Sequence, residues 1–178
     1  ADIAFGINKY VKSTGDNTFL LNYGLEILIE TARFWYDLGE FIPGLDGSFC
    51  FHEVTGPDEY TALVNNNLYT NIMAKENLVN AVSYLQELEK TENIVYQDFI
   101  QKFNITDEEM MSWENAANNI RIPFNSNLSL YAQDDAFLNR PVWDFEGTPE
   151  NKYPLLLHFH PLSIYRYQVI KQADLVMA

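Results

Sequence analysis

The sequence has little cysteine, little positive charge and no long apolar run. Its single cysteine, Cys50, cannot form a disulfide within the chain, so a reducing compartment such as the cytoplasm is expected. Lys and Arg number 11 against 25 Asp and Glu, a net charge of -14 that disfavours nucleic acid, whose phosphates need a basic face. No apolar stretch is long enough to cross a membrane, and no signal peptide opens the chain. We therefore expect a cytoplasmic protein that binds neither nucleic acid nor membrane.

Good metal ligands are also scarce. The three histidines, His52, His158 and His160, share no spacing with other good ligands on one helix. The acidic run QDDAF at residues 133–137 lacks the spaced oxygen ligands and glycine of a helix-loop-helix calcium site. We predict no metal site and interpret this run as a turn that orders its loop.

Apolar residues are plentiful and recur at helical spacing. The chain of 178 residues is 47% hydrophobic and 15% aromatic, enough for one domain with a sizeable core. Helical signals, with apolar positions three and four residues apart, cover five stretches: residues 4–11, 17–38, 68–88, 106–120 and 163–178.

Two of these helices carry further detail. In residues 17–38, a second stripe of Leu20, Ile27 and Phe34 predicts burial on two sides. At residue 106 a threonine stands three residues before Glu109, the pattern of a capping box at a helix start.

The loops between the helices are long. Residues 41–60 are punctuated by Gly and Pro, with a short strand expected at 48–52, and residues 121–161 are rich in Asn, Asp, Pro and aromatics. A long irregular stretch in a compact domain usually carries function. The pattern favours an all-α helical toroid or barrel with loops around a pocket, although periodicity alone also fits a bundle.

The stretch VTGPDEY, residues 54–60, has the clearest chemical character. Pro57 fixes its own backbone angle and restricts Gly56, so the corner directs the residues that follow. Asp58 and Glu59 are neighbours, so their side chains leave the backbone in different directions. A carboxyl group beside an aromatic wall and a second carboxylate can have its pKa raised, as a general acid requires. The alternative is an ordinary acidic turn in which Asp58 caps the chain and Glu59 is solvated.

A second candidate lies near the C-terminus. Lys171 and Gln172 offer an ammonium and an amide that can bind sugar hydroxyls, and the expected helix places them one step apart. The alternative is a Lys-Gln pair on an ordinary helix surface.

Several motifs in register resemble glycoside hydrolase family 65, the inverting phosphorylases of maltose, trehalose, kojibiose and nigerose. They are residues 27–35 (ILIETARFW), 54–60 (VTGPDEY), 64–71 (VNNNLYTN), 133–137 (QDDAF) and 169–174 (VIKQAD), which span nearly the whole chain. The resemblance implies an (α/α)6 barrel, with residues 1–178 forming part of its catalytic domain. Because the chain starts without Met and stops in an apolar stretch, we expect both ends to be truncated.

The resemblance also implies the site. The family's general acid falls on Glu59, and its Lys-Gln pair, which contacts the glucosyl unit, falls on Lys171 and Gln172. Asp58 is expected to support substrate binding. Apart from the resemblance, the position of Trp143 in the long loop suggests that it can stack on a sugar ring. No cofactor is expected, because inorganic phosphate is the co-substrate.

The implied activity is inverting phosphorolysis of a maltose-type disaccharide to β-glucose 1-phosphate and glucose. Hydrolysis with inversion needs a second carboxylate to activate water, whereas phosphate already carries negative charge. In the family the phosphate-binding loop follows the Lys-Gln segment, and hydrolytic relatives have their water-activating base in that same region. Because the sequence stops six residues after Gln172, it does not include this region. An inverting α-glucoside hydrolase is therefore an alternative, as is a fragment inactive on its own. The family resemblance suggests a homodimer.

Overall fold

The computed structural model describes residues 1–178, which are mostly helical and form two compact units. Unit 1 comprises Ala1–Cys50 and Met73–Ile120, and unit 2 comprises Phe51–Ile72 and Arg121–Ala178. No helix combines the length and apolar character that crossing a membrane requires.

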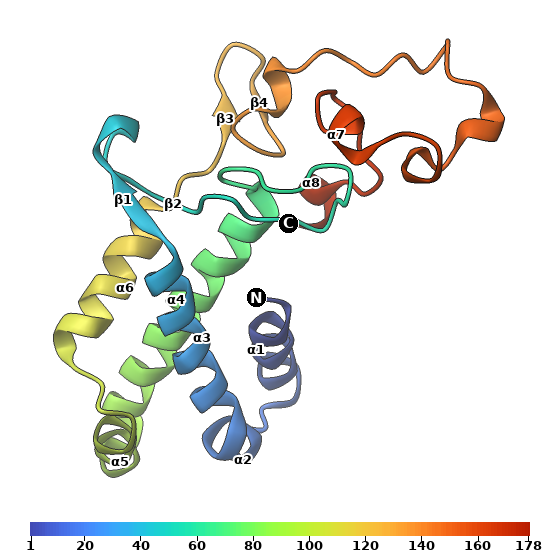
Figure 1. Ribbon diagram of the computed structural model, residues 1–178. Coiled ribbons are helices and arrows are strands. Elements are labelled where there is room, and N and C mark those ends of the chain that lie inside the picture. The colour runs from blue at the N-terminus through green and yellow to red at the C-terminus, as the bar shows by residue number, and fades with distance from the viewer. The chain divides into compact units, whose positions relative to one another are not determined.

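Unit 1 is built from helices and one small hairpin (Figure 1). The helices are α1 (Asp2–Thr14), α2 (Asn17–Phe19), α3 (Leu25–Leu38), α5 (Asn93–Phe103), α6 (Asp107–Asn119) and, from Met73 on, α4 (Leu68–Thr91). The hairpin pairs β1 (Glu40–Ile42) with β2 (Ser48–Cys50) in antiparallel register, which confirms the expected strand at 48–52. The helices expected at 4–11, 68–88 and 106–120 are likewise confirmed.

The stretch 17–38 differs from the single helix that its periodicity predicts. A π-helical turn, Leu20–Gly24, separates α2 from α3. The predicted burial on two sides is also wrong for part of the second stripe, since Ile27 is 37% and Phe34 56% exposed. The other face of α3 is buried, with Leu28 and Ala32 both fully inaccessible. There the Asn77 side chain of α4 donates a hydrogen bond to the Leu28 carbonyl at 3.0 Å, so α3 and α4 are in direct contact.

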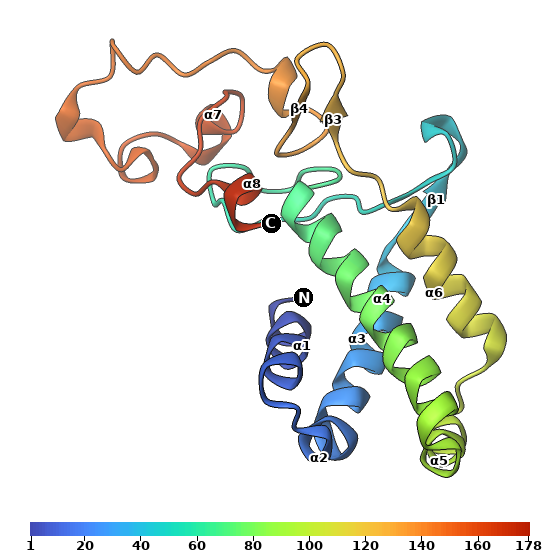
Figure 2. The ribbon, with the colours of Figure 1, turned by 180° about the vertical axis from the view of Figure 1, so that it is seen from behind.

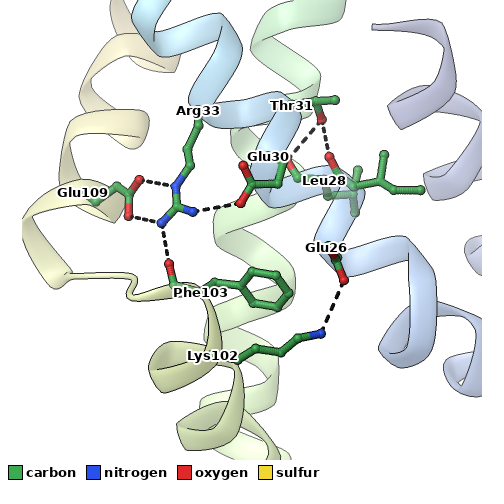
Figure 3. Close-up of polar contacts among 9 residues, drawn as sticks. Glu26, Leu28, Glu30, Thr31, Arg33, Lys102, Phe103 and Glu109 are labelled. Atoms are coloured by element: carbon green, nitrogen blue, oxygen red, sulfur yellow. Dashed lines mark hydrogen bonds and ion pairs between the residues drawn. The ribbon is translucent and has the colours of Figure 1, made fainter.

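Arg33 links α3 to α6 (Figure 3). Its Nε and Nη2 donate to the two carboxylate oxygens of Glu109 at 2.7 and 3.0 Å, and Nη2 also donates to the Phe103 carbonyl at 2.8 Å. Thr106 caps α6 as expected, with its Oγ1 accepting from the Glu109 N–H at 3.1 Å. The Glu109 side chain, which in a capping box bonds back to the N-cap residue, instead pairs with Arg33 of α3. Two tryptophans lie in the core of unit 1, since Trp35 is 9% and Trp113 0% exposed.

Unit 2 is largely irregular, as expected for residues 121–161. It holds a short antiparallel pair, β3 (Phe124–Asn125) with β4 (Leu130–Tyr131), and two one-turn helices, α7 (Pro161–Ile164) and α8 (Asp174–Met177). Its apolar centre consists of Tyr60, Trp143, Leu155, Ile164 and Val169.

The tryptophan at the centre of unit 2 is a core residue. Trp143 is 9% exposed and makes edge contacts with the rings of Phe159 and Tyr167, at 5.0 and 5.1 Å between centroids. Its indole N–H donates to Thr148 at 2.9 Å. The expected stacking of Trp143 on a sugar ring is therefore not supported, because neighbouring aromatic side chains occupy its surroundings.

The helix expected from residue 163 to the end is wrong over its middle part. Gln168 instead pairs with the chain before Trp143: its N–H donates to the Pro141 carbonyl at 2.7 Å, and its carbonyl accepts from the Trp143 N–H at 3.4 Å. These bonds hold the backbone at Gln168 in a bridge to Val142 and not in a helix. Lys171 and Gln172 then lie in a bend rather than on a helix face.

The Arg33 contacts predict a measurable loss of stability. Arg33→Ala removes two parallel bonds to Glu109 and should lower the free energy of unfolding by about 1–3 kcal/mol. Arg33→Lys should recover only part of this loss, because an ammonium cannot donate a planar pair of bonds. Urea denaturation of the natural full-length protein measures both.

A matched control is Lys102, whose ion pair with Glu26 on the same unit is 64% and 51% exposed (Figure 3). Lys102→Ala should change the free energy of unfolding by less than about 0.5 kcal/mol. Equal effects for Arg33→Ala and Lys102→Ala would contradict the account of the α3–α6 link.

Candidate active site

The loop of residues 51–67 directs one carboxylate inward and the next outward. Two backbone bonds between Val54 and Val64, at 2.9 and 2.8 Å, close this loop. Asp58 is 0% and Tyr60 5% exposed, and the Tyr60 hydroxyl accepts from the Leu155 N–H at 2.9 Å. With its two flanking side chains held inside, Glu59 projects outward and its side chain is 59% exposed. The structure thus gives the two acidic neighbours different environments.

The buried Asp58 carboxylate accepts hydrogen bonds on both oxygens. The donors come from the loop of residues 51–67, from residue 133 and from the Lys-Gln segment. They are Tyr60 N (3.2 Å), Thr61 Oγ1 (3.5 Å), Gln133 Nε2 (2.8 Å), Lys171 N (2.9 Å) and Gln172 N (3.3 Å). Oδ1 takes the three backbone donors and Oδ2 the two side-chain donors. Because five donors already use its two oxygens and the side chain is fully buried, Asp58 has no free acceptor position for a sugar hydroxyl.

The four residues that the sequence predicts as a site therefore lie together in unit 2. Lys171 Nζ forms an ion pair with the Glu59 carboxylate, and Lys171 and Gln172 are both exposed. The hydrogen bond to Glu59 is the main cause that raises the pKa of Lys171, so this ammonium stays charged at neutral pH. An exposed carboxylate, an ammonium and an amide in one place can together deliver a proton and bind hydroxyl groups.

A second buried carboxylate, Asp174, supports this arrangement from α8. In both ribbon views α8 lies beside the loop of residues 51–67 (Figures 1 and 2). Asp174 is 0% exposed and its Oδ2 accepts from Asn67 Nδ2 at 2.8 Å. Burial is the main cause that raises the pKa of Asp174, and the carboxylates of Asp58 and Asp134 act in the same direction.

Asn67 in turn begins α4. Its Oδ1 accepts from the Thr70 N–H and hydroxyl, both at 3.0 Å, which is the usual bond of a helix N-cap. Its Nδ2 bonds to Asp174 and to the Gln133 carbonyl at 3.3 Å. One asparagine therefore connects α4, α8 and the turn at residue 133.

Asn67, Gln133 and Asp174 carry no predicted role, although each lies within a motif that resembles the family. The missing signal is burial: nothing in the sequence marks these polar side chains as 0% or 1% exposed. The run at 133–137 does form the expected turn. Asp134 Oδ1 accepts from the Ala136 N–H at 2.8 Å, and this bond orders the turn.

Known proteins resemble this chain over its whole length. The family model described as "Glycosyl hydrolase family 65 central catalytic domain" matches residues 1–178. The alpha,alpha-trehalose phosphorylase of Geobacillus stearothermophilus is 51% identical over 178 residues, 100% of this chain, and that of Thermoanaerobacter brockii is 48% identical over 177 residues, 99% of it. The chain spans 23% of the length of each of these two relatives.

Relatives of lower identity are also named as disaccharide phosphorylases. A kojibiose phosphorylase of Halothermothrix orenii is 36% identical over 177 residues, which are 99% of this chain and 23% of the relative. A solved structure named "Putative kojibiose phosphorylase from human microbiome" superposes with a TM-score of 0.84 at 29% identity, covering 98% of this chain and 25% of that one.

The Asn67–Asp174 contact predicts that Gly56 cannot be replaced. A Cβ on Gly56 would lie 2.5 Å from Asn67 Nδ2, Asn67 Oδ1 and Asp174 Oδ2. Gly56→Ala should therefore lower the free energy of unfolding by about 1–3 kcal/mol, as overpacking of a filled interior does. Thermal or urea denaturation of the natural full-length protein measures this.

Gly44 provides the control, because a Cβ there would meet no atom within 4 Å. Gly44→Ala should leave stability within about 0.5 kcal/mol of the original protein. Equal tolerance of Gly56→Ala and Gly44→Ala would contradict the close approach of Asn67 and Asp174 to Gly56.

Proposed function

The chain belongs to glycosyl hydrolase family 65, and on that premise we propose that the natural full-length protein cleaves an α-glucosidic disaccharide with inorganic phosphate. The observation that carries this proposal is the exposed Glu59 carboxylate in an ion pair with Lys171, beside Gln172. The relatives support phosphorolysis, since those at 48% and 51% identity are named trehalose phosphorylases. They favour α,α-trehalose over a maltose-type disaccharide as the first substrate to test.

The proposed reaction uses Glu59 as the general acid. Protonated Glu59 gives its proton to the glycosidic oxygen while the C1–O bond breaks and its electron pair stays on that oxygen. A phosphate oxygen forms the new bond to C1 from the opposite face, which inverts the configuration and yields β-glucose 1-phosphate and glucose. Lys171 and Gln172 are proposed to hold hydroxyl groups of the glucosyl unit. Phosphate brings its own negative charge, so the reaction needs no second carboxylate to act as a base.

The surrounding protein is proposed to be part of a larger catalytic domain. The family match over residues 1–178 and the superposition over 98% of the chain support an (α/α)6 barrel to which these helices and loops contribute. The phosphate site is proposed to lie on a segment other than those described above. A cytoplasmic location and a homodimer remain proposals that rest on the family resemblance.

The ion pair between Lys171 and Glu59 places a requirement on this mechanism. A general acid must carry a proton, whereas the Glu59 carboxylate in this structure accepts a hydrogen bond from the Lys171 ammonium. Both side chains are exposed, at 42% and 59%, so solvent screens the pair and substrate hydroxyls can compete for Lys171. We propose that substrate binding draws Lys171 away from Glu59, after which Glu59 takes up the proton that it delivers.

The first prediction concerns the co-substrate. The full-length protein should release glucose 1-phosphate from α,α-trehalose, tested beside maltose, kojibiose and nigerose, only when phosphate is present. Glu59→Gln should lower this rate by about 10²–10⁴-fold, because an amide cannot donate the proton. The nearby exposed Glu53→Gln is the control and should leave the rate unchanged.

Two results would oppose this assignment. Cleavage at the same rate without phosphate would identify a hydrolase instead. Near-normal turnover by Glu59→Gln would remove Glu59 from the acid role. Proton NMR of the first product formed reads the anomer and so tests inversion.

The second prediction concerns proton uptake. If Lys171 releases Glu59, binding of the disaccharide in the absence of phosphate should take up a proton from solution. Calorimetric titrations in two buffers of different ionisation enthalpy measure that proton. Lys171→Met removes the ion pair and should lower or abolish the uptake; an uptake equal to that of the unmodified protein would contradict the proposed release.

A further inference from the structure

We propose that Asp58 is a positioning residue, whose buried carboxylate holds the backbone of Lys171 and Gln172 against the loop that carries Glu59. The inference rests on the proposed function and extends it to a residue that contacts no substrate. From the sequence, Asp58 was expected to support substrate binding directly. Its full burial and its hydrogen bonds assign it to the layer behind the exposed groups.

Two backbone N–H groups have the Asp58 carboxylate as their acceptor. Lys171 and Gln172 precede α8 and lie in a bend, so no helix supplies acceptors for their N–H groups. Asp58 Oδ1 accepts both, at 2.9 and 3.3 Å. A hydrogen bond to a charged acceptor is shorter and stronger than a neutral one, and a buried donor left without a partner is costly. Asp58 therefore fixes the position of the backbone at Lys171 and Gln172.

The same carboxylate also holds its own loop. Oδ1 accepts from the Tyr60 N–H at 3.2 Å, which closes the backbone around Glu59. Tyr60 is anchored in turn through its hydroxyl to Leu155. A single oxygen atom thus bonds to the residue just after the acid and to both residues of the Lys-Gln pair.

Two side-chain donors fix the orientation of the Asp58 carboxylate. Oδ2 accepts from Gln133 Nε2 at 2.8 Å and from Thr61 Oγ1 at 3.5 Å, so the group cannot rotate without losing these bonds. Lys171 Nζ bonds to Glu59 and not to Asp58. Asp58 therefore accepts hydrogen bonds from peptide N–H groups and neutral side chains, and the Lys171 ammonium is left to bond with Glu59 and the substrate.

The consequence for catalysis follows from geometry. The side chains of Lys171 and Glu59 leave from backbones 112 residues apart in sequence, and Asp58 bonds to both segments. A displacement of about 1 Å between catalytic groups can cost about 10²-fold in rate. Without Asp58, the Lys-Gln segment should move relative to Glu59 while each side chain remains chemically intact.

Two substitutions at Asp58 separate this role from others. Asp58→Ala removes every acceptor and should lower kcat/KM for phosphorolysis of the best disaccharide by about 10²-fold. Asp58→Asn can keep one oxygen toward Lys171 and Gln172. Its new amide can donate to Gln133 Oε1, which is buried and has no partner, once the Gln133 amide turns over. Asp58→Asn should therefore retain activity within about tenfold of the unmodified protein.

A second substrate distinguishes positioning from acid catalysis. α-Glucosyl fluoride needs no proton on its leaving group, so Glu59→Gln should cleave it far better, relative to the unmodified protein, than it cleaves the disaccharide. Asp58→Ala should remain impaired on both substrates, because it displaces the Lys-Gln segment that holds the glucosyl unit. This contrast separates positioning from acid catalysis, and a comparison with a destabilised control separates positioning from a loss of folding.

The control is Asp135→Ala in the same unit. Asp135 bonds to Asn66 at 2.6 Å and to Arg121 at 2.9 Å, so its loss should lower stability without touching the Lys-Gln segment. Asp135→Ala should retain kcat/KM at a temperature where the protein stays folded. Asp58→Ala within about threefold of the unmodified protein, or an equal loss in Asp135→Ala at equal stability, would overturn the positioning role. An unmodified protein without phosphate-dependent cleavage would instead overturn the proposed function.

Discussion

The hydrogen bonds from the backbone of Lys171 and Gln172 to the Asp58 carboxylate are the interaction on which the site depends. They join the loop of residues 51–67 to the last part of the chain, two segments that the sequence separates by more than a hundred residues. With Asp58 and Tyr60 directed inward, Glu59 is directed outward and meets Lys171. The exposed chemistry therefore follows from a buried contact.

That contact lies within a group of buried polar residues that complete one another. Asn67 bonds to Asp174 and caps α4, and Gln133 bonds to Asp58 through its side chain and to Asn67 through its carbonyl. Buried carboxylates are unfavourable unless hydrogen bonds or a shifted pKa compensate for the lost water. Asp58 has the hydrogen bonds, and Asp174 has a raised pKa as well as its bond to Asn67. This packing leaves space only for glycine at position 56.

Sequence periodicity was sufficient for several helices, although not for α5, which none of the expected stretches covers. The capped helix after Thr106 and the long helix from Leu68 are found where the apolar spacing predicts them. It failed where tertiary hydrogen bonds compete with local preference. The apolar spacing predicts a helix over residues 165–173, but the backbone of Gln168 pairs with Pro141 and Trp143. A helix there would also engage the Lys171 N–H in a bond within the helix, so that it could not donate to Asp58.

The same distinction applies to the site. Glu59, Lys171 and Gln172 could be predicted because the family motifs single them out, and the structure brings them together. Asp58 was singled out too, but its role as an acceptor of backbone bonds depends on a partner 113 residues away, which no local pattern reveals. Trp143 shows the opposite error: a loop position suggested an exposed ring, and packing against Phe159 and Tyr167 buries it.

The central claim, that Asp58 holds the Lys-Gln segment in place, can be measured directly by hydrogen-deuterium exchange in the natural full-length protein. The amides of Lys171 and Gln172 should exchange at least about tenfold faster in Asp58→Ala than in the unmodified protein, since a bond to a charged acceptor contributes about 1.5–3 kcal/mol. Amides of α6, in the other unit, should be unaffected. Unchanged exchange at Lys171 and Gln172 would contradict the claim.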